Sequence, residues 1–248
     1  GEGRGHFTQA ITLEEMLLRN GHEVAEVLVG KSSTRTLPGF FNRSIHAPVK
    51  RFISPNFLPT ADNKRANLTK SFAYNLLRLP EYLRSMYYIN QRIRETGAEV
   101  VINFYELLTG LTYALFRPSV PYICVGHQYL FLHRDFEFPD KNSCQLWMLR
   151  FFTRMTALRS SKKLALSFLE MEQDDMNQIV TVPPLIRQEV TAIHPEKGDY
   201  IHGYMVNSGF ADSVESFHAK HPEVPLTFFW DRSDAEEVTR IDLSLIHI

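Results

Sequence analysis

The sequence is short of cysteine, of net charge and of long apolar runs. Its two cysteines, Cys124 and Cys144, have no metal-binding spacing, so we expect reduced thiols in a cytosolic protein. Lys plus Arg is 27 and Asp plus Glu is 28, and the formal net charge of −1 argues against a nucleic-acid binder held by bulk positive charge. No run approaches about 18 uncharged apolar residues, so no membrane-spanning helix is predicted. No signal peptide is visible either.

Both ends of the sequence are abrupt. There is no initiator Met, and the chain opens on a glycine-rich turn, Gly1 to His6, of the kind that follows a buried strand. That strand is absent from the sequence, which ends on the mostly apolar residues 243–248. We therefore expect a fragment truncated at both ends and lacking the first strand of its sheet.

What the sequence does have is apolar surface and a regular alternation of patterns. Hydrophobic residues make up 44% and aromatic residues 12%, enough for a large core. Helical spacing of apolar residues predicts a first helix from Phe7, and others over 68–96 (divided by Pro80), 107–116, 141–159 and 211–220. Short apolar runs predict strands over 23–29, 99–104, 121–125, 163–168, 178–182, 199–206 and 224–230. The alternation predicts an α/β protein with a Rossmann-like, doubly wound parallel sheet.

The strand–helix pattern restarts after a proline pair at 183–184. We predict an N-terminal domain over 1–184, a linker over 185–198, and the opening βαβ unit of a second Rossmann-like domain over 199–248. A single βαβ unit cannot bury its own core, so this second domain is expected to be truncated. Residues 31–67 show little periodicity and predict a long irregular excursion.

The glycine turn carries the first candidate site. Its pattern Gly1-x-Gly3-x-x-His6 departs from the dinucleotide fingerprint at the third glycine, and no acidic ribose ligand follows the second strand. A histidine at a helix start points its imidazole into the crevice above the sheet. The positive helix end favours its neutral form, which is a base for a hydroxyl nucleophile. A lone histidine is more often structural, but the flanking glycines favour the catalytic interpretation.

The segment Gly3-Arg4-Gly5-His6-Phe7-Thr8-Gln9-Ala10, followed by Gly21-His22-Glu23-Val24, resembles the amino-terminal signature of GT-B glycosyltransferases. The chain is similar to family 28 and UDP-glycosyltransferase-like enzymes, in the style of the peptidoglycan-precursor N-acetylglucosaminyltransferase. The resemblance implies two Rossmann-like domains facing a cleft. It also implies transfer of a sugar, with inversion, from a nucleotide-diphosphate donor (a UDP-sugar) to an acceptor hydroxyl. No cofactor and no metal are expected, because helix dipoles and amides bear the diphosphate charge and no Asp-x-Asp cluster occurs.

The resemblance assigns roles on the acceptor side of the cleft. His6 matches the base, within a turn made by Gly3, Arg4 and Gly5. Its carboxylate partner is expected near Asn103, which carries no charge, so Glu106 would take that role. The alternative for Glu106 is a helix N-terminal charge.

Two further segments match the cleft. His127 and Gln128 fall where the family has a polar loop after a strand, although His127 would otherwise only satisfy backbone groups. Asn207, Ser208 and Gly209 resemble the turn whose amides meet the donor diphosphate; the alternative is an ordinary turn.

Residues 31–70 carry eight Lys or Arg against one acid, Asp62, with Phe40, Phe41, Phe52 and Phe57 interleaved. This composition suits a lipid-linked acceptor or an anionic membrane surface, and we expect a cytoplasmic protein at the inner face of the plasma membrane. The alternative is a solvated basic loop packed by its phenylalanines.

The expected partners are a nucleotide-sugar donor and a lipid-linked or saccharide acceptor, without nucleic acid. The fragment itself is expected to be inactive. Two other functions stay open: a sugar-nucleotide epimerase of the same fold, and a non-catalytic module that binds a nucleotide or saccharide.

Overall fold

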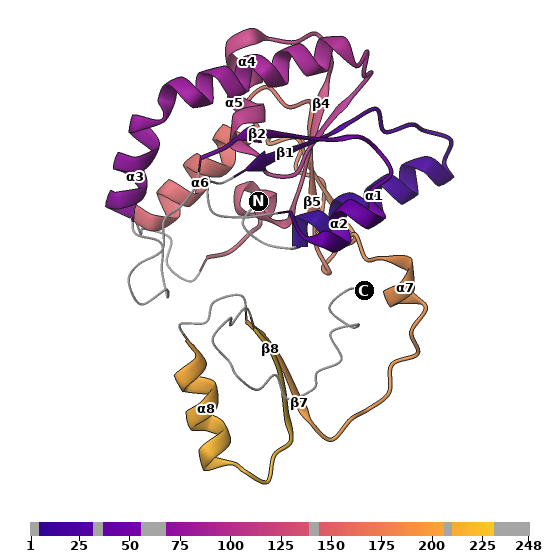
Figure 1. Ribbon diagram of the computed structural model, residues 1–248, viewed down its shortest axis with the longest axis vertical. Coiled ribbons are helices and arrows are strands. Elements are labelled where there is room, and N and C mark those ends of the chain that lie inside the picture. The colour runs from indigo at the N-terminus through magenta and orange to yellow at the C-terminus, as the bar shows by residue number, and fades with distance from the viewer. Residues whose placement is uncertain (1–4, 32–36, 56–67, 139–143, 206–209, 231–248) are drawn as a thin grey trace. The chain divides into compact units, whose positions relative to one another are not determined.

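The computed structural model describes residues 5–31, 37–55, 68–138, 144–205 and 210–230 (Figure 1). In this part of the chain no helix is long and apolar enough to cross a membrane. The chain divides into two compact units, residues 1–55 with 78–187, and residues 56–77 with 188–248. The first unit thus ends three residues after the predicted limit at 184, and the second takes in 56–77, which the sequence analysis placed in the first domain.

The first unit alternates helices with parallel strands. Its helices are α1 (Gly5–Arg19), α2 (Gly39–Ser44), α4 (Leu79–Glu95), α5 (Leu107–Phe116), the 3-10 helix η1 (His127–Leu132) and α6 (Cys144–Thr156). Its strands are β1 (Val27–Lys31), β2 (Val49–Ile53), β3 (Val101–Asn103), β4 (Tyr122–Val125), β5 (Lys162–Leu166) and β6 (Ile179–Val182). Strands β1 and β2 pair in one parallel sheet, and β3-β4-β5-β6 form another in that order. The predicted α/β class with parallel pairing is confirmed.

The second unit contains the predicted βαβ pattern. Strand β7 (Ile201–Met205), helix α8 (Ala211–Lys220) and strand β8 (Leu226–Trp230) follow one another, and the two strands pair in parallel. Helix α3 (Leu68–Leu77) also belongs to this unit, and the four-residue helix α7 (Gln188–Thr191) lies in the predicted linker.

The predicted irregular excursion over 31–67 is wrong for residues 39–53. Helix α2 and strand β2 lie there, and β2 pairs with β1 from Val27↔Val49 to Lys31↔Ile53. The strand pattern was hidden because β2 contains the charged residues Lys50 and Arg51. Charged side chains are common on edge strands, and β2 is at the edge of a two-stranded sheet.

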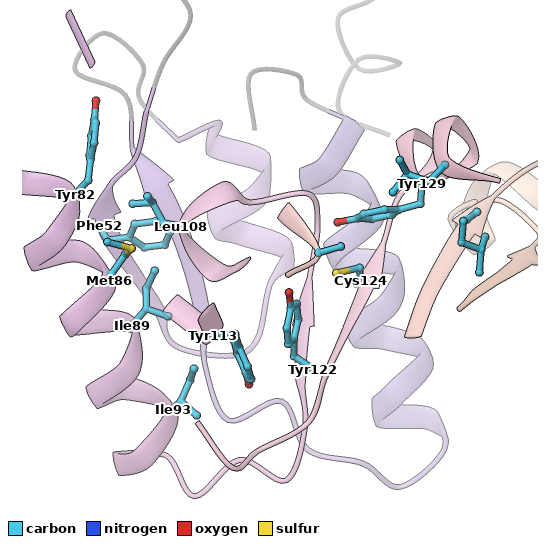
Figure 2. Packing of buried hydrophobic residues seen from close by; sticks show 14 residues of the cluster. Phe52, Tyr82, Met86, Ile89, Ile93, Leu108, Tyr113, Tyr122, Cys124 and Tyr129 are labelled. Atoms are coloured by element: carbon cyan, nitrogen blue, oxygen red, sulfur yellow. The ribbon is translucent and has the colours of Figure 1, made fainter. Parts of the chain in front are cut away.

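The sheet of β1 and β2 is covered on both faces. Leu28 packs, with the buried Phe52, against the core that includes α4, whereas Val27 and Val29 pack against α1 and α2. Alternation of successive side chains between two faces is the geometry of a strand. The larger core extends through α4, α5, β4 and η1, and Figure 2 shows Met86, Ile89 and Ile93 arranged along α4.

Candidate functional site

The candidate residues lie where the strands of the first unit end. Strand β3 ends at Asn103 and β4 at Val125, and Asn103 pairs with Cys124 in the sheet. Glu106 and His127 follow these two neighbouring strands along the chain. Because open α/β folds bind ligands at the carboxyl ends of their strands, this edge is the candidate cleft.

His6 lies in the first turn of α1 with its ring mostly withdrawn from water. Burial of the ring, reinforced by the charges of the N-terminal amine and then of His127, lowers its pKa from 6.5 to about 4, although a hydrogen bond with Gln9 acts in the opposite direction. Because the charge of His127 affects the pKa of His6, the two predicted histidines lie near each other. Within the described residues, the buried Nδ1 atom of His6 has no hydrogen-bond partner. The ring is therefore neutral near pH 7 and has a free nitrogen, the state that can accept a proton.

The side-chain amide of Asn103 forms hydrogen bonds with the backbone around it. Its side chain is 2% exposed, and Nδ2 donates to the carbonyls of Thr156 (3.0 Å) and Glu106 (3.1 Å). Its Oδ1 accepts from the Glu106 N–H at 2.9 Å. Between them Tyr105 adopts a left-handed backbone with φ 59°. The amide thus shapes the turn after β3 and ties it to α6, while a cleft role for Asn103 stays a prediction.

Glu106 caps α5. Its Oε1 accepts from the Leu108 N–H (3.2 Å) and from the Ser54 hydroxyl (2.7 Å). A Cβ placed on Gly30 would lie 2.6 Å from Oε2, so the carboxylate fills the space that a side chain there would need. The alternative of a helix N-terminal charge is what the structure shows. The contacts described for Glu106 do not include His6, and the proposed His–carboxylate pair stays a prediction.

Ser54 and Gly30 were not predicted as residues of the site. Ser54 follows β2, a strand that was not predicted, and its contact with Glu106 spans 52 residues of sequence. Gly30 offered a signal, because a glycine inside a strand often marks the close approach of another group.

His127 opens the 3-10 helix η1, and its side chain is exposed. Partial desolvation lowers the pKa of its ring. The structure describes no hydrogen bond to this ring within the residues it covers, which leaves both nitrogens available. Tyr129 anchors η1 in the core: it is fully buried, and its hydroxyl lies 3.1 Å from Thr156 Oγ1. Gln128 turns its Oε1 back toward Gly126 and buries it without a partner in the described structure.

The remaining predicted residues lie outside the described ones. These are Gly3 and Arg4 before α1, and Asn207, Ser208 and Gly209 between β7 and α8. Gly5 is described, as the first residue of α1. In the described ranges, no group of three or more His, Cys, Asp or Glu is placed to hold a metal ion.

We expect His6 to titrate near pH 4 in the folded chain. A depressed histidine pKa means that the unfolded chain binds a proton more readily than the folded one. His6 should therefore make stability fall as the pH drops from 6.5 to about 4, with no further change below that range. Imidazole NMR resonances followed against pH measure this, and His6→Gln identifies the signal. A His6 pKa of 6 or higher would contradict the burial of the ring.

Comparison with known proteins identifies the family and the fold. Residues 1–239 match the sequence model of glycosyl transferase family 1, and no curated protein matches the chain. The chain is similar to the crystal structure of Arabidopsis thaliana UGT89C1 complexed with UDP-L-rhamnose, with a TM-score of 0.52 and 13% identity, covering 94% of this chain and 63% of that one. For the crystal structure of Acinetobacter baumannii MurG, the TM-score is 0.46 and the identity 11%, covering 94% of this chain and 58% of that one.

The chain therefore spans less than two thirds of either structure's chain. The similarity to UGT89C1 concerns the fold, a Rossmann-like α/β arrangement with parallel sheets. The family match covers nearly the whole sequence, including the His6 turn and the βαβ unit of the second unit. The chain belongs to glycosyl transferase family 1 and has the GT-B fold that its amino-terminal signature predicted.

Proposed function

We propose that the chain carries the acceptor side of a glycosyltransferase, which moves a sugar from a nucleotide-diphosphate donor to an acceptor hydroxyl. The proposal rests on His6, whose ring is mostly withdrawn from water in the first turn of α1 and has a lowered pKa, and on its electrostatic interaction with His127. Family membership supports the class of reaction. The ligand in the UGT89C1 structure, UDP-L-rhamnose, supports a UDP-sugar as the first donor to test.

In the proposed reaction, the acceptor hydroxyl loses its proton to His6 while its oxygen attacks the anomeric carbon of the sugar. The bond from that carbon to the diphosphate oxygen breaks, and the nucleoside diphosphate leaves with the bonding electron pair. One displacement on the opposite face inverts the anomeric centre. Backbone amides before α8 would stabilise the departing diphosphate without a metal, because a helix N-terminus favours anions.

The test is a screen of UDP-, GDP- and dTDP-sugars with the full-length enzyme, in which nucleotide release and the new glycoside are measured by chromatography. We expect acceptor-dependent release of UDP that persists in EDTA. Interconversion of the free sugar nucleotides without transfer would instead indicate an epimerase. Binding of a donor with no turnover would indicate a non-catalytic module. The 248-residue chain alone is expected to show no turnover.

We also propose a cytoplasmic location at the inner face of the plasma membrane. The basic segment 31–70 includes 32–36 and 56–67, which lie outside the described residues. In its described part Phe40, Phe41 and Phe52 are buried in the two cores, so these side chains hold the fold together rather than face lipid. A membrane contact through this segment would then depend on its charge.

A further inference from the structure

Helix α6 presents several large apolar side chains to solvent. Trp147 is 63% exposed, Phe151 49% and Met148 42%. Together with the exposed Cys144 they recur at the spacing that places residues on one face of a helix. The rings of Trp147 and Phe151 are stacked, 5.3 Å apart and 8° from parallel. The outer face of α6 is therefore a continuous aromatic and apolar stripe.

Two small polar residues of α6 lie in the core beside apolar ones. Thr153 and Thr156 are fully buried, and Thr153 Oγ1 lies 2.7 Å from the Tyr105 hydroxyl. The backbone of α6 approaches α5 so closely that a Cβ added to Gly110 would lie 2.2 Å from the Met155 carbonyl oxygen. Leu146 is buried and the Phe152 ring lies 5.6 Å from that of Tyr105, so α6 already has apolar residues for the core and carries a second apolar stripe outside. The core does not require the outer stripe, and exposed apolar stripes mark interaction surfaces.

The charge of the segment indicates which surface would cover the stripe. From Cys144 to Lys163 the sequence has no Asp or Glu, and three of its basic residues, Arg154, Arg159 and Lys162, are exposed. Arg150 buries its Nε atom, and Lys163 donates to the Asn177 carbonyl, so these two are not part of the outer surface. Trp and Phe beside arginines are the residues that lie in the headgroup region of a bilayer, and basic residues add attraction to anionic lipid. Complementarity in both apolar character and charge favours a lipid surface.

We propose that α6 is a docking surface for anionic lipid bilayers, with Trp147, Met148 and Phe151 in the headgroup region and Arg154 and Arg159 against lipid phosphates. The surface uses residues other than 31–70. It also needs no catalysis, so lipid binding can fail while sugar transfer is found, and the reverse.

The test uses the intrinsic fluorescence of α6. The protein has two tryptophans, so the Trp230→Phe variant leaves Trp147 as the only reporter. We expect its emission to shift to the blue with vesicles of phosphatidylcholine and phosphatidylglycerol, but not with phosphatidylcholine alone. In co-sedimentation with the acidic vesicles, Trp147→Ala with Phe151→Ala should weaken binding at least about tenfold. Arg154→Gln with Arg159→Gln should weaken it about tenfold as well.

Two control variants test whether the loss of vesicle binding is specific to α6. Phe217→Ala removes an exposed aromatic residue from α8, and Arg94→Gln an exposed arginine from α4, and both should bind acidic vesicles like the unmodified chain. Circular dichroism checks that each variant is folded. Binding that ignores lipid charge, or that survives the Trp147 and Phe151 replacements, would overturn the proposal. So would self-association through this face without vesicle binding, which would assign it to a second copy of the chain.

Discussion

Replacing His6 with Ala is expected to lower the rate of sugar transfer by the full-length enzyme about a thousandfold, the usual contribution of a general base. The imidazole is neutral well below pH 7 because burial lowers its pKa to about 4, so it can take the acceptor proton across the physiological range. The loss should appear in kcat rather than in the KM for the donor, because the proposed role of His6 is proton transfer from the acceptor hydroxyl and not donor binding. Initial rates at saturating donor measure it.

His22→Ala is the matched control, because this exposed histidine follows the last turn of α1 and is expected to keep full activity. Glu106→Gln in the same assay separates two roles. An amide oxygen can still cap α5, so a pure capping role predicts near-normal rates, whereas a partner of protonated His6 predicts a clear loss. A loss of less than tenfold in His6→Ala would show that His6 is not the general base and that another residue takes this role.

The parts of the fold that the sequence predicted well are those where local pattern and burial coincide. Helix α5 begins and ends at the predicted residues 107 and 116. The predicted helix over 68–96 is divided, as expected, but at Arg78, and Pro80 lies in the first turn of α4. Strand β2 was not predicted because it contains charged residues and lies at a sheet edge, where tertiary pairing outweighs local propensity. Periodicity also revealed α6, but a stripe of apolar residues does not say whether it turns toward the core or away from it.

The candidate site divides in the same way. His6 and His127 were predictable because each follows a glycine at the start of a helix, a signal contained in a few consecutive residues. The environment of Glu106 was not, since it depends on Ser54 and Gly30 from two other strands. Asn103 was read as a cleft residue from its position at a strand end, yet its amide is used by the backbone of its own turn and of α6.

Gly110→Ala is expected to destabilise the first unit by about 3 kcal/mol, although alanine is the better helix former by about 1 kcal/mol. The new Cβ would lie 2.2 Å from the Met155 carbonyl oxygen and 2.8 Å from the Thr156 carbonyl, backbone atoms that cannot turn aside. Helix α6 would have to move away from α5, which strains the Asn103–Thr156 hydrogen bond. Urea unfolding of the Trp230→Phe protein measures the loss, because Trp147 reports from α6 itself.

Gly39→Ala is the matched control for this effect. A Cβ at Gly39, in the first turn of α2, meets only the flexible end of the Arg43 side chain at 3.3 Å. Because that guanidinium can move aside, the free energy of unfolding should change by less than about 1 kcal/mol. If both variants were equally stable, α5 and α6 would not be in close backbone contact. The comparison therefore tests the close packing of α6 on α5, which holds the side of α6 with Thr153 and Thr156 in the core, while Trp147 is exposed.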